Sequence, residues 1–598
     1  MAKKPARDAS DGTQSGIPPY SHNDPTGSGI DFTSPTKETQ RTHSASIAAK
    51  VSPVNAEYDD ARFIGDLNPE GVFLAEASPQ DVCGAPSDSG IGLWSKRKAE
   101  DSLTPRKMIP PSSILSGLSP AVQQILLPIV REDCLSTLPP PFHRQALCAM
   151  YVEKFDPIFP VVDLPVYNGL SEESPSRVLL EQAMCLIASM TFASKPHLLL
   201  GDEAEVLEHK AFGKRVFAAM RMSIETSMVR EKTILIQALC AMSFFSDGPE
   251  SSELSSTLIS RTITYAWSLG LHVQERGEDV SATTPRGTLL CIVWVLDRLN
   301  ATLNGRAVIM HERDVERPLQ ECFSSQKPAF RLLLQVIQQL ESVITLYRPR
   351  ADESSTKSKI EESFALFEDL VSKCGCNQIA NEELATVELL YHAVAILSHR
   401  STLATQDSTA TSFSKARRAL SVDKITAMMV QDYDSSVTLF PFAPYAVTLA
   451  SSVNYREMRR SKVPLFRARA RVSFEKNCAV LRHLGEIFWS AAVIADMGKL
   501  TLGEVDRAYA RFAVERRATI HDISSGTLSE AVPQDMLQQD IQSTTADVDP
   551  FYFTEMPNLE PFDMFDPEFD LNGVDAYLEG NLDRGGFGEP PFSLMDPD

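Results

Sequence analysis

The chain has 598 residues, of which 43% are hydrophobic and 23% charged, and 79 Asp and Glu against 57 Lys and Arg give a formal net charge of −22. This length allows roughly three or four domains. The longest apolar runs, residues 183–193 and 289–296, fall well short of the roughly 18 residues that a membrane span needs, so the sequence excludes a transmembrane protein.

The N-terminus, MAKKPARDAS, lacks the apolar core of a secretory signal, so we expect an intracellular protein with reduced thiols. Ten cysteines are scattered along the chain, mostly inside apolar stretches where a thiol acts as a small hydrophobe. The one close pair, Cys374 and Cys376, has no second pair to complete a zinc site. We therefore predict neither a disulfide framework nor a metal site.

Residues 1–116 are rich in Ser, Pro, Gly, Asp and Thr and show no apolar periodicity, which predicts a disordered segment. Two short basic clusters stand near its end and suit a bipartite nuclear-import signal, although an ordinary solvated charge run would look the same. The candidate import residues are Lys96, Arg97, Lys98, Arg106 and Lys107.

Residues 117–520 carry apolar side chains at helical spacing and predict a large all-α domain. Strand alternation is scarce, and no repeat of fixed period is present. Gly270 follows a periodic run at the position where a left-handed glycine ends a helix. The expected helices cover residues 177–192, 233–245, 254–269, 288–303, 330–346, 384–400, 443–458 and 479–497.

A basic patch lies late in this domain, within residues 455–472. It could grip phosphates without reading their sequence, or it could be a solvated helical surface. A third hypothesis is that the acidic C-terminal tail docks on it and stays masked until released. The patch consists of Arg456, Arg459, Arg460, Lys462, Arg467, Arg469 and Arg471.

Residues 521–598 predict a disordered acidic tail. Its last 58 residues, 541–598, hold fourteen acids against the single base Arg584, a local charge of −13. Nine aromatic residues alternate with these acids, a composition typical of activation segments that offer aromatic side chains to a partner's groove. A merely solvating acidic terminus is the alternative, but such a tail would be poor in aromatics. The side chains singled out for activation are Phe562, Phe565, Phe569 and Tyr577.

The common catalytic and nucleotide-binding motifs are missing, among them a P-loop, a dinucleotide glycine fingerprint, a G-x-S-x-G elbow and an H-E-x-x-H helix. An all-α enzyme of the terpene-cyclase kind would need an aspartate-rich helix to hold magnesium. The one Asp-Asp pair, Asp59-Asp60, lacks the third carboxylate. We therefore predict no enzyme, no catalytic residues and no cofactor.

Four passages resemble the middle homology region of fungal zinc binuclear cluster transcription factors. Tyr151–Asp163 is similar to the opening of that region, and Arg230–Phe245 with the Leu-Gly-Leu-His that follows is similar to its glycine–histidine helix end. Trp294–Arg306 resembles the family's tryptophan, Asp-Arg and Gly-Arg-Pro sequence, with alanine in place of the proline at 307 and of the usual serine at 301. Residues 389–400 are like a helix that recurs late in the domain.

The resemblance covers roughly residues 145–400, and the shared residues are expected to support the fold. The family's DNA-binding module needs six cysteines around two zinc ions, and only Cys83 precedes Cys134 here. Either a DNA-bound partner makes the contact, or an upstream exon has been lost, or the basic patch binds DNA directly. The motif residues are Gly270, His272, Trp294, Asp297, Arg298, Gly305 and Arg306.

Together these features predict a nuclear regulator of a set of fungal genes, for example those of a metabolic or secondary-metabolite pathway. Its expected partners are transcription machinery or coactivators, a DNA-binding protein or promoter DNA, with a small-molecule inducer left open and no membrane contact. A helical scaffold or corepressor without activating function is the main alternative, and an all-α enzyme is a weaker one.

Overall fold

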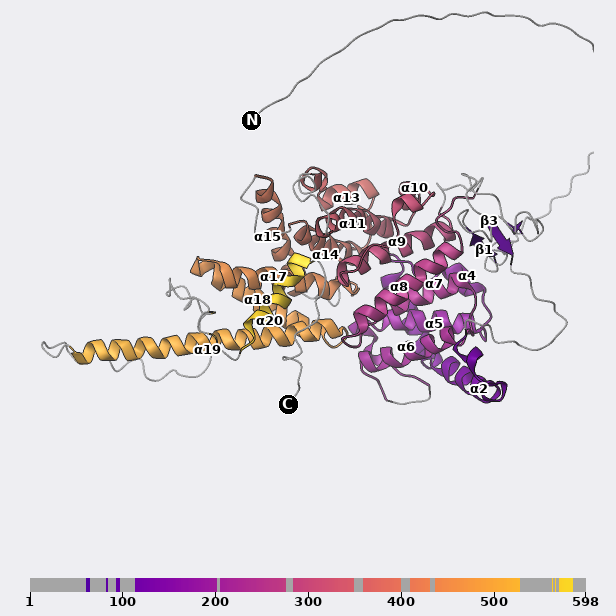
Figure 1. The fold of residues 1–598 in the computed structure, drawn as a ribbon, viewed down its shortest axis with the longest axis horizontal. Coiled ribbons are helices and arrows are strands. Elements are labelled where there is room, and N and C mark those ends of the chain that lie inside the picture. The colour runs from indigo at the N-terminus through magenta and orange to yellow at the C-terminus, as the bar shows by residue number, and fades with distance from the viewer. Residues whose placement is uncertain are drawn as a thin grey trace, which may run out of the picture. The chain divides into compact units, whose positions relative to one another are not determined.

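The computed structural model describes residues 61–64, 82–83, 93–96, 113–201, 205–275, 283–348, 359–399, 409–430, 436–526, 562, 565 and 569–584. Within these ranges the chain is almost entirely helical, as the sequence predicted (Figure 1). None of the described helices combines the length and the apolar composition required to span a bilayer.

The helices follow one another with short connections. They are α2 (Pro120–Ser136), α3 (Pro141–Met150), α4 (Leu164–Gly169), α5 (Pro175–Ala188), α6 (His209–Glu225), α7 (Lys232–Met242), α8 (Ser251–Ser268), α9 (Pro285–Leu303), α10 (Leu319–Ser324), α11 (Pro328–Ile344), α13 (Phe367–Cys374), α14 (Asn381–Leu397), α15 (Thr409–Val430), α17 (Phe442–Arg460), α18 (Pro464–Leu484), α19 (Trp489–Gly526) and α20 (Leu571–Arg584). A single π-helical turn, Tyr151–Phe155, continues α3, and short 3-10 turns occupy Ile114–Gly117, Phe192–His197, Glu312–Asp314 and Thr345–Tyr347.

Several central helices are apolar on nearly all sides because neighbours cover them all round. In α7 every residue from Ile234 to Met242 is buried, and α5 is buried from Val178 to Ala188. Helices α9, α11, α14 and α17 extend the same core, with α7 against α5 and α8, and α14 against α11, α15 and α17. Burial of this kind supplies most of the stability of short helices, whose intrinsic propensity is weak.

The expected helix over residues 479–497 is wrong, because the chain turns within it. Helix α18 ends at Leu484 and α19 begins at Trp489. Leu484, Ile487 and Phe488 are all buried, so the apolar pattern runs through the turn and conceals it. A Cβ at Gly485 would lie 2.9 Å from the Ala492 Cα, so the missing side chain lets the two helices approach closely.

The segment expected to be disordered, 1–116, contributes three short strands among its described residues. Strands β1 (Ala61–Ile64), β2 (Val82–Cys83) and β3 (Leu93–Lys96) form an antiparallel sheet in the order β1-β3-β2, with Phe63 opposite Trp94. Trp94 is 2% exposed and packs on Val273, which anchors the sheet to the helical domain. Strands of two to four residues are too short for alternation to appear in the sequence.

The helix end at Gly270 has the predicted left-handed glycine, with φ of +67°. The Gly270 N–H donates to the Trp267 carbonyl and the Leu271 N–H to the Ala266 carbonyl, a pairing that satisfies the last carbonyls of α8. The Trp94 indole lies directly over the glycine, and its Nε1 donates to the Leu269 carbonyl at 3.4 Å. The motif glycine is thus needed twice, for its backbone conformation and for the space above it.

Gly270→Ala is expected to lower the free energy of unfolding by about 1–3 kcal/mol, because it places a side chain at positive φ. The new Cβ would also lie 2.8 Å from the Trp94 ring. Urea unfolding of the full chain measures the effect. Gly248→Ala is the matched control, since nothing lies within 4 Å of its added Cβ. Equal midpoints for the two variants would contradict the prediction.

His272 should make the stability depend on pH. Its ring lies between Phe63 and Trp267, with centroids 5.0 and 4.2 Å away, and burial lowers its pKa to about 4. Between pH 6.5 and 4 the unfolded chain therefore binds a proton that the folded chain does not, so the free energy of unfolding falls by up to about 1.4 kcal/mol per pH unit as the pH drops. His272→Gln should flatten this dependence in unfolding titrations. An unchanged slope would show that His272 does not contribute.

Candidate functional site

The motif residues of α9 form a fully buried charged cluster. Asp297 and Arg298 are each 0% exposed, and the Arg298 Nη1 lies 3.2 Å from the Asp297 Oδ2. The Asp297 carboxylate also accepts hydrogen bonds from the backbone N–H groups of Ile309 and Met310. Burial raises the pKa of Asp297, although these hydrogen bonds and the Arg298 charge oppose the shift. The cluster therefore fixes the loop after α9 to the helix itself.

Arg298 extends the cluster to a second helix. Its Nη2 donates to the Met310 carbonyl at 2.9 Å and to the Glu341 carboxylate of α11 at 2.7 Å, and its guanidinium lies 4.6 Å from the Trp294 ring centre. A buried guanidinium is tolerated only when its donors are paired in this way. Arg306, by contrast, is exposed and 3.9 Å from Glu253. The first motif residues hold the fold together, while Arg306 lies at the surface.

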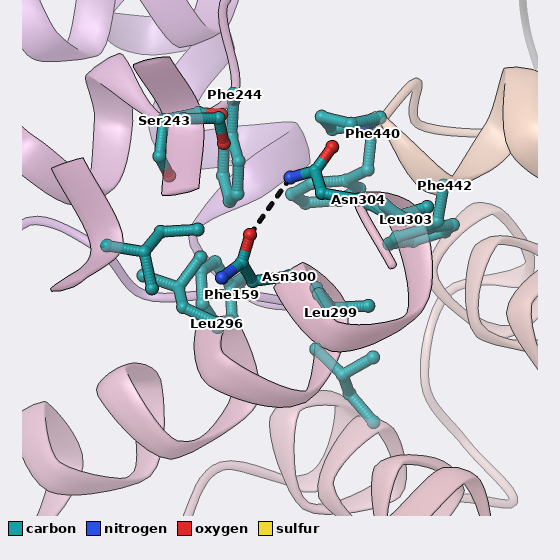
Figure 2. A pocket seen from close by; sticks show the side chains of 14 residues that line it. Phe159, Ser243, Phe244, Leu296, Leu299, Asn300, Leu303, Asn304, Phe440 and Phe442 are labelled. Carbon is teal, nitrogen blue, oxygen red and sulfur yellow. Dashed lines mark hydrogen bonds between the residues drawn. The ribbon is translucent and has the colours of Figure 1, made fainter. Parts of the chain in front are cut away.

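An apolar cleft opens beside the C-terminal half of α9 (Figure 2). Its empty volume, including the part open to solvent, is about 470 Å³. Two amides lie in it: the Asn300 Oδ1 accepts hydrogen bonds from the Asn304 Nδ2 at 3.0 Å and from the Ser256 Oγ at 2.9 Å. The remaining walls are mainly aromatic and aliphatic, from Phe159, Phe244, Ile259, Leu296, Leu299, Leu303, Leu333, Phe440 and Phe442.

The C-terminal half of α17 carries the first three arginines of the basic patch, and helix α20 of the tail lies against it. Figure 1 shows α20 in yellow beside α17. The Glu579 carboxylate accepts both an Nε and an Nη2 hydrogen bond from Arg460, and it lies 3.5 Å from the Arg456 Nε. Asp575, one turn earlier, accepts the Tyr455 hydroxyl and lies 3.7 Å from the Arg459 Nε. The tail thus places acids on the patch at a spacing of four residues.

Apolar side chains of the tail fill the rest of this contact. Val574 and Leu578 are 0% exposed, and Phe562 is 3% exposed. The Phe562 ring packs edge-on against Tyr455, with Arg459 4.8 Å above its centre. We call this surface of α17, around Tyr455–Arg460, the tail seat.

The other residues of the patch are used differently. Arg467 is buried and donates to the Ser461 carbonyl at 3.1 Å. Arg471 pairs with Glu475 and Asp506, which raises its pKa further. Lys462 and Arg469 are exposed. The seven bases predicted as one patch therefore do not form one cationic surface.

Residues 149–414 match the family model of the fungal specific transcription factor domain. The chain carries a fungal specific transcription factor domain. The match confirms the resemblance read from the four sequence passages, and this family comprises fungal transcription regulators. Comparison with curated proteins and with solved structures gives no match.

The fungal transcription factor domain and the tail meet at Tyr347, which lies within the matched residues. Its hydroxyl donates to the Leu397 carbonyl at 2.8 Å and to the Leu582 carbonyl of α20 at 3.4 Å. Leu582 is 4% exposed. The last turn of α20 is therefore in direct contact with the matched domain.

Helix α20 was missed by the sequence analysis, which placed it in a disordered tail. A signal was present, because Leu571, Val574, Leu578 and Leu582 have helical spacing. The Asp570 carboxylate caps the helix by accepting the Gly573 N–H at 2.8 Å. Two glycines in fourteen residues obscured this pattern, since glycine disfavours helix interiors.

The remaining predicted residues have varied positions. Phe565 and Phe569 are half-buried and stack in series beyond Phe562, with centroids 4.9 and 5.3 Å apart. The backbone of Tyr577 lies in α20. Lys96 ends β3, and the other import candidates, Arg97, Lys98, Arg106 and Lys107, lie outside the described residues, as does Asp59-Asp60.

The described residues contain no group of His, Cys, Asp or Glu that could hold a metal ion. The Cys376 thiol donates to the Pro328 carbonyl at 3.1 Å, and burial raises its pKa to about 11. Cys374 is buried in α13, and burial raises its pKa too. The pair therefore packs as ordinary core thiols.

Arg298→Met is expected to lower the free energy of unfolding by about 3–5 kcal/mol, because it leaves the buried Asp297 without its cation. The measurement is urea unfolding of the full chain. Arg306→Met is the control, and as a surface change it should stay within about 0.5 kcal/mol of the parent. Comparable losses in both variants would show that the burial of Arg298 is not what matters.

Proposed function

We propose that the protein is a nuclear transcription regulator of a set of fungal genes, in which the helical domain regulates and the acidic-aromatic tail activates. The fungal transcription factor domain carries the first part of this proposal. The tail supports the second, because it combines a local charge of −13 with nine aromatic residues. Activation segments of this type bind coactivator grooves through their aromatic side chains.

DNA contact is proposed to occur through a DNA-bound partner. Direct binding by the basic patch would need free cations, since phosphate contacts come mainly from Arg and Lys. Arg456, Arg459 and Arg460 are instead paired with α20, and Arg471 with two acids of its own domain. Promoter mapping by crosslinking in cells, paired with a gel shift of the purified chain on the mapped sites, separates the two routes.

A small-molecule inducer, left open by the family resemblance, would find its best place in the cleft beside α9. Aromatic walls with one or two amides are typical of pockets for compact, largely apolar ligands. Asn300 and Asn304 would supply the polar contacts, and Phe159, Phe244 and Phe440 the stacking surfaces.

The proposal predicts that residues 541–598, fused to a heterologous DNA-binding module, activate a reporter gene. Replacing Phe562, Phe565 and Phe569 together by Ala should reduce this activity at least about tenfold, since aromatic anchors dominate such interfaces. Replacing Ser543, Thr544 and Thr545 by Ala is the matched control and should have no effect. A silent or repressing tail would favour the scaffold or corepressor function instead.

A further inference from the structure

The side chains that would bind a coactivator are the ones that the tail seat covers. A helix enters a partner's groove through the apolar residues of one face. In α20 that face is Val574, Leu578 and Leu582, and all three are buried against the domain together with Phe562. A coactivator groove and the tail seat therefore cannot hold the same helix at once.

We propose that the tail seat is an intramolecular competitor of the coactivator, and that α20 must leave α17 before the tail can activate transcription. This inference rests on the proposed activating function of the tail. The seat is an interaction surface for an acidic amphipathic helix, and its occupant is the chain's own α20.

The seat selects this helix by charge at two consecutive turns. Asp575 meets Tyr455 and Arg459 on one turn, and Glu579 meets Arg456 and Arg460 on the next. The Glu579 side chain is only 7% exposed, so its charge depends on the two arginines that surround it. A buried carboxylate that loses its cations is strongly destabilised, whereas an exposed one is barely affected.

The docked helix is also held by the domain that matches the family. Tyr347 donates to the Leu582 carbonyl at the end of α20, and the same hydroxyl donates to Leu397 at the end of α14. A change in the packing of α14 or α17 would therefore alter the seat directly. Occupancy of the seat depends on the state of the regulatory domain and not on the tail alone.

The test uses the full chain fused to a heterologous DNA-binding module. Arg456→Glu with Arg460→Glu removes both cations from Glu579 and should raise reporter activity by about fivefold or more, the lower end of typical coupling between two sites. Lys462→Glu with Arg469→Glu makes the same change of charge at exposed positions with no contact to α20 among those described, and it should leave the activity unchanged.

A charge exchange protects the test against misfolding. Adding Glu579→Arg to Arg456→Glu and Arg460→Glu restores opposite charges across the contact and should return activity toward the low parental level. Glu579→Arg in the isolated tail fusion should leave its activity unchanged, which shows that the residue acts through docking.

Amide hydrogen exchange on the purified full chain supplies a second readout. Residues 571–584 should be protected in the parent and in the charge exchange, and should exchange faster in the Arg456→Glu, Arg460→Glu variant. An active isolated tail combined with no gain in the released full chain would overturn the competition while leaving the proposed function intact. A silent isolated tail would overturn the proposed function, and exchange rates that do not change would overturn the docking.

Discussion

The fold depends on a charge that has no contact with water. The Arg298 guanidinium is enclosed completely, and the free energy lost by removing it from solvent is recovered only through Asp297, Glu341, the Met310 carbonyl and the face of Trp294. These partners belong to α9, to the loop that follows it and to α11. Because such a group tolerates few alternative arrangements, it fixes how these three segments meet. Asn300 and Asn304, one and two turns further along α9, take their positions in the cleft from the same anchor.

Helix α17 joins the regulatory core to the tail. Its first residue, Phe442, lines the cleft, and its last two turns form the tail seat. Along most of its length it is buried by α14, α15 and α18, and α20 covers part of what remains. One rigid element therefore borders both places where this protein could receive a signal or emit one.

The sequence predicts the parts of this structure in which pattern and burial agree over many residues. Long apolar helices such as α7 and α9 were found because every turn repeats the same signal, and Gly270 was placed correctly because only one residue type suits its backbone. The turn after Leu484 was missed because its residues are as apolar as the helices beside it. Helix α20 was missed because much of its stability comes from α17, more than a hundred residues away, and local propensity carries no record of that contact.

The pairing at the tail seat makes each charged surface the counterion of the other. With α20 in place, Arg456, Arg459 and Arg460 need no dissolved anions, and Asp575 and Glu579 need no dissolved cations. Separation of the two helices must therefore take up ions from solution, so the docked state weakens as salt concentration rises. A polyanion reaching the three arginines would replace α20 as their counterion, and its binding and the exposure of the tail would be one and the same exchange.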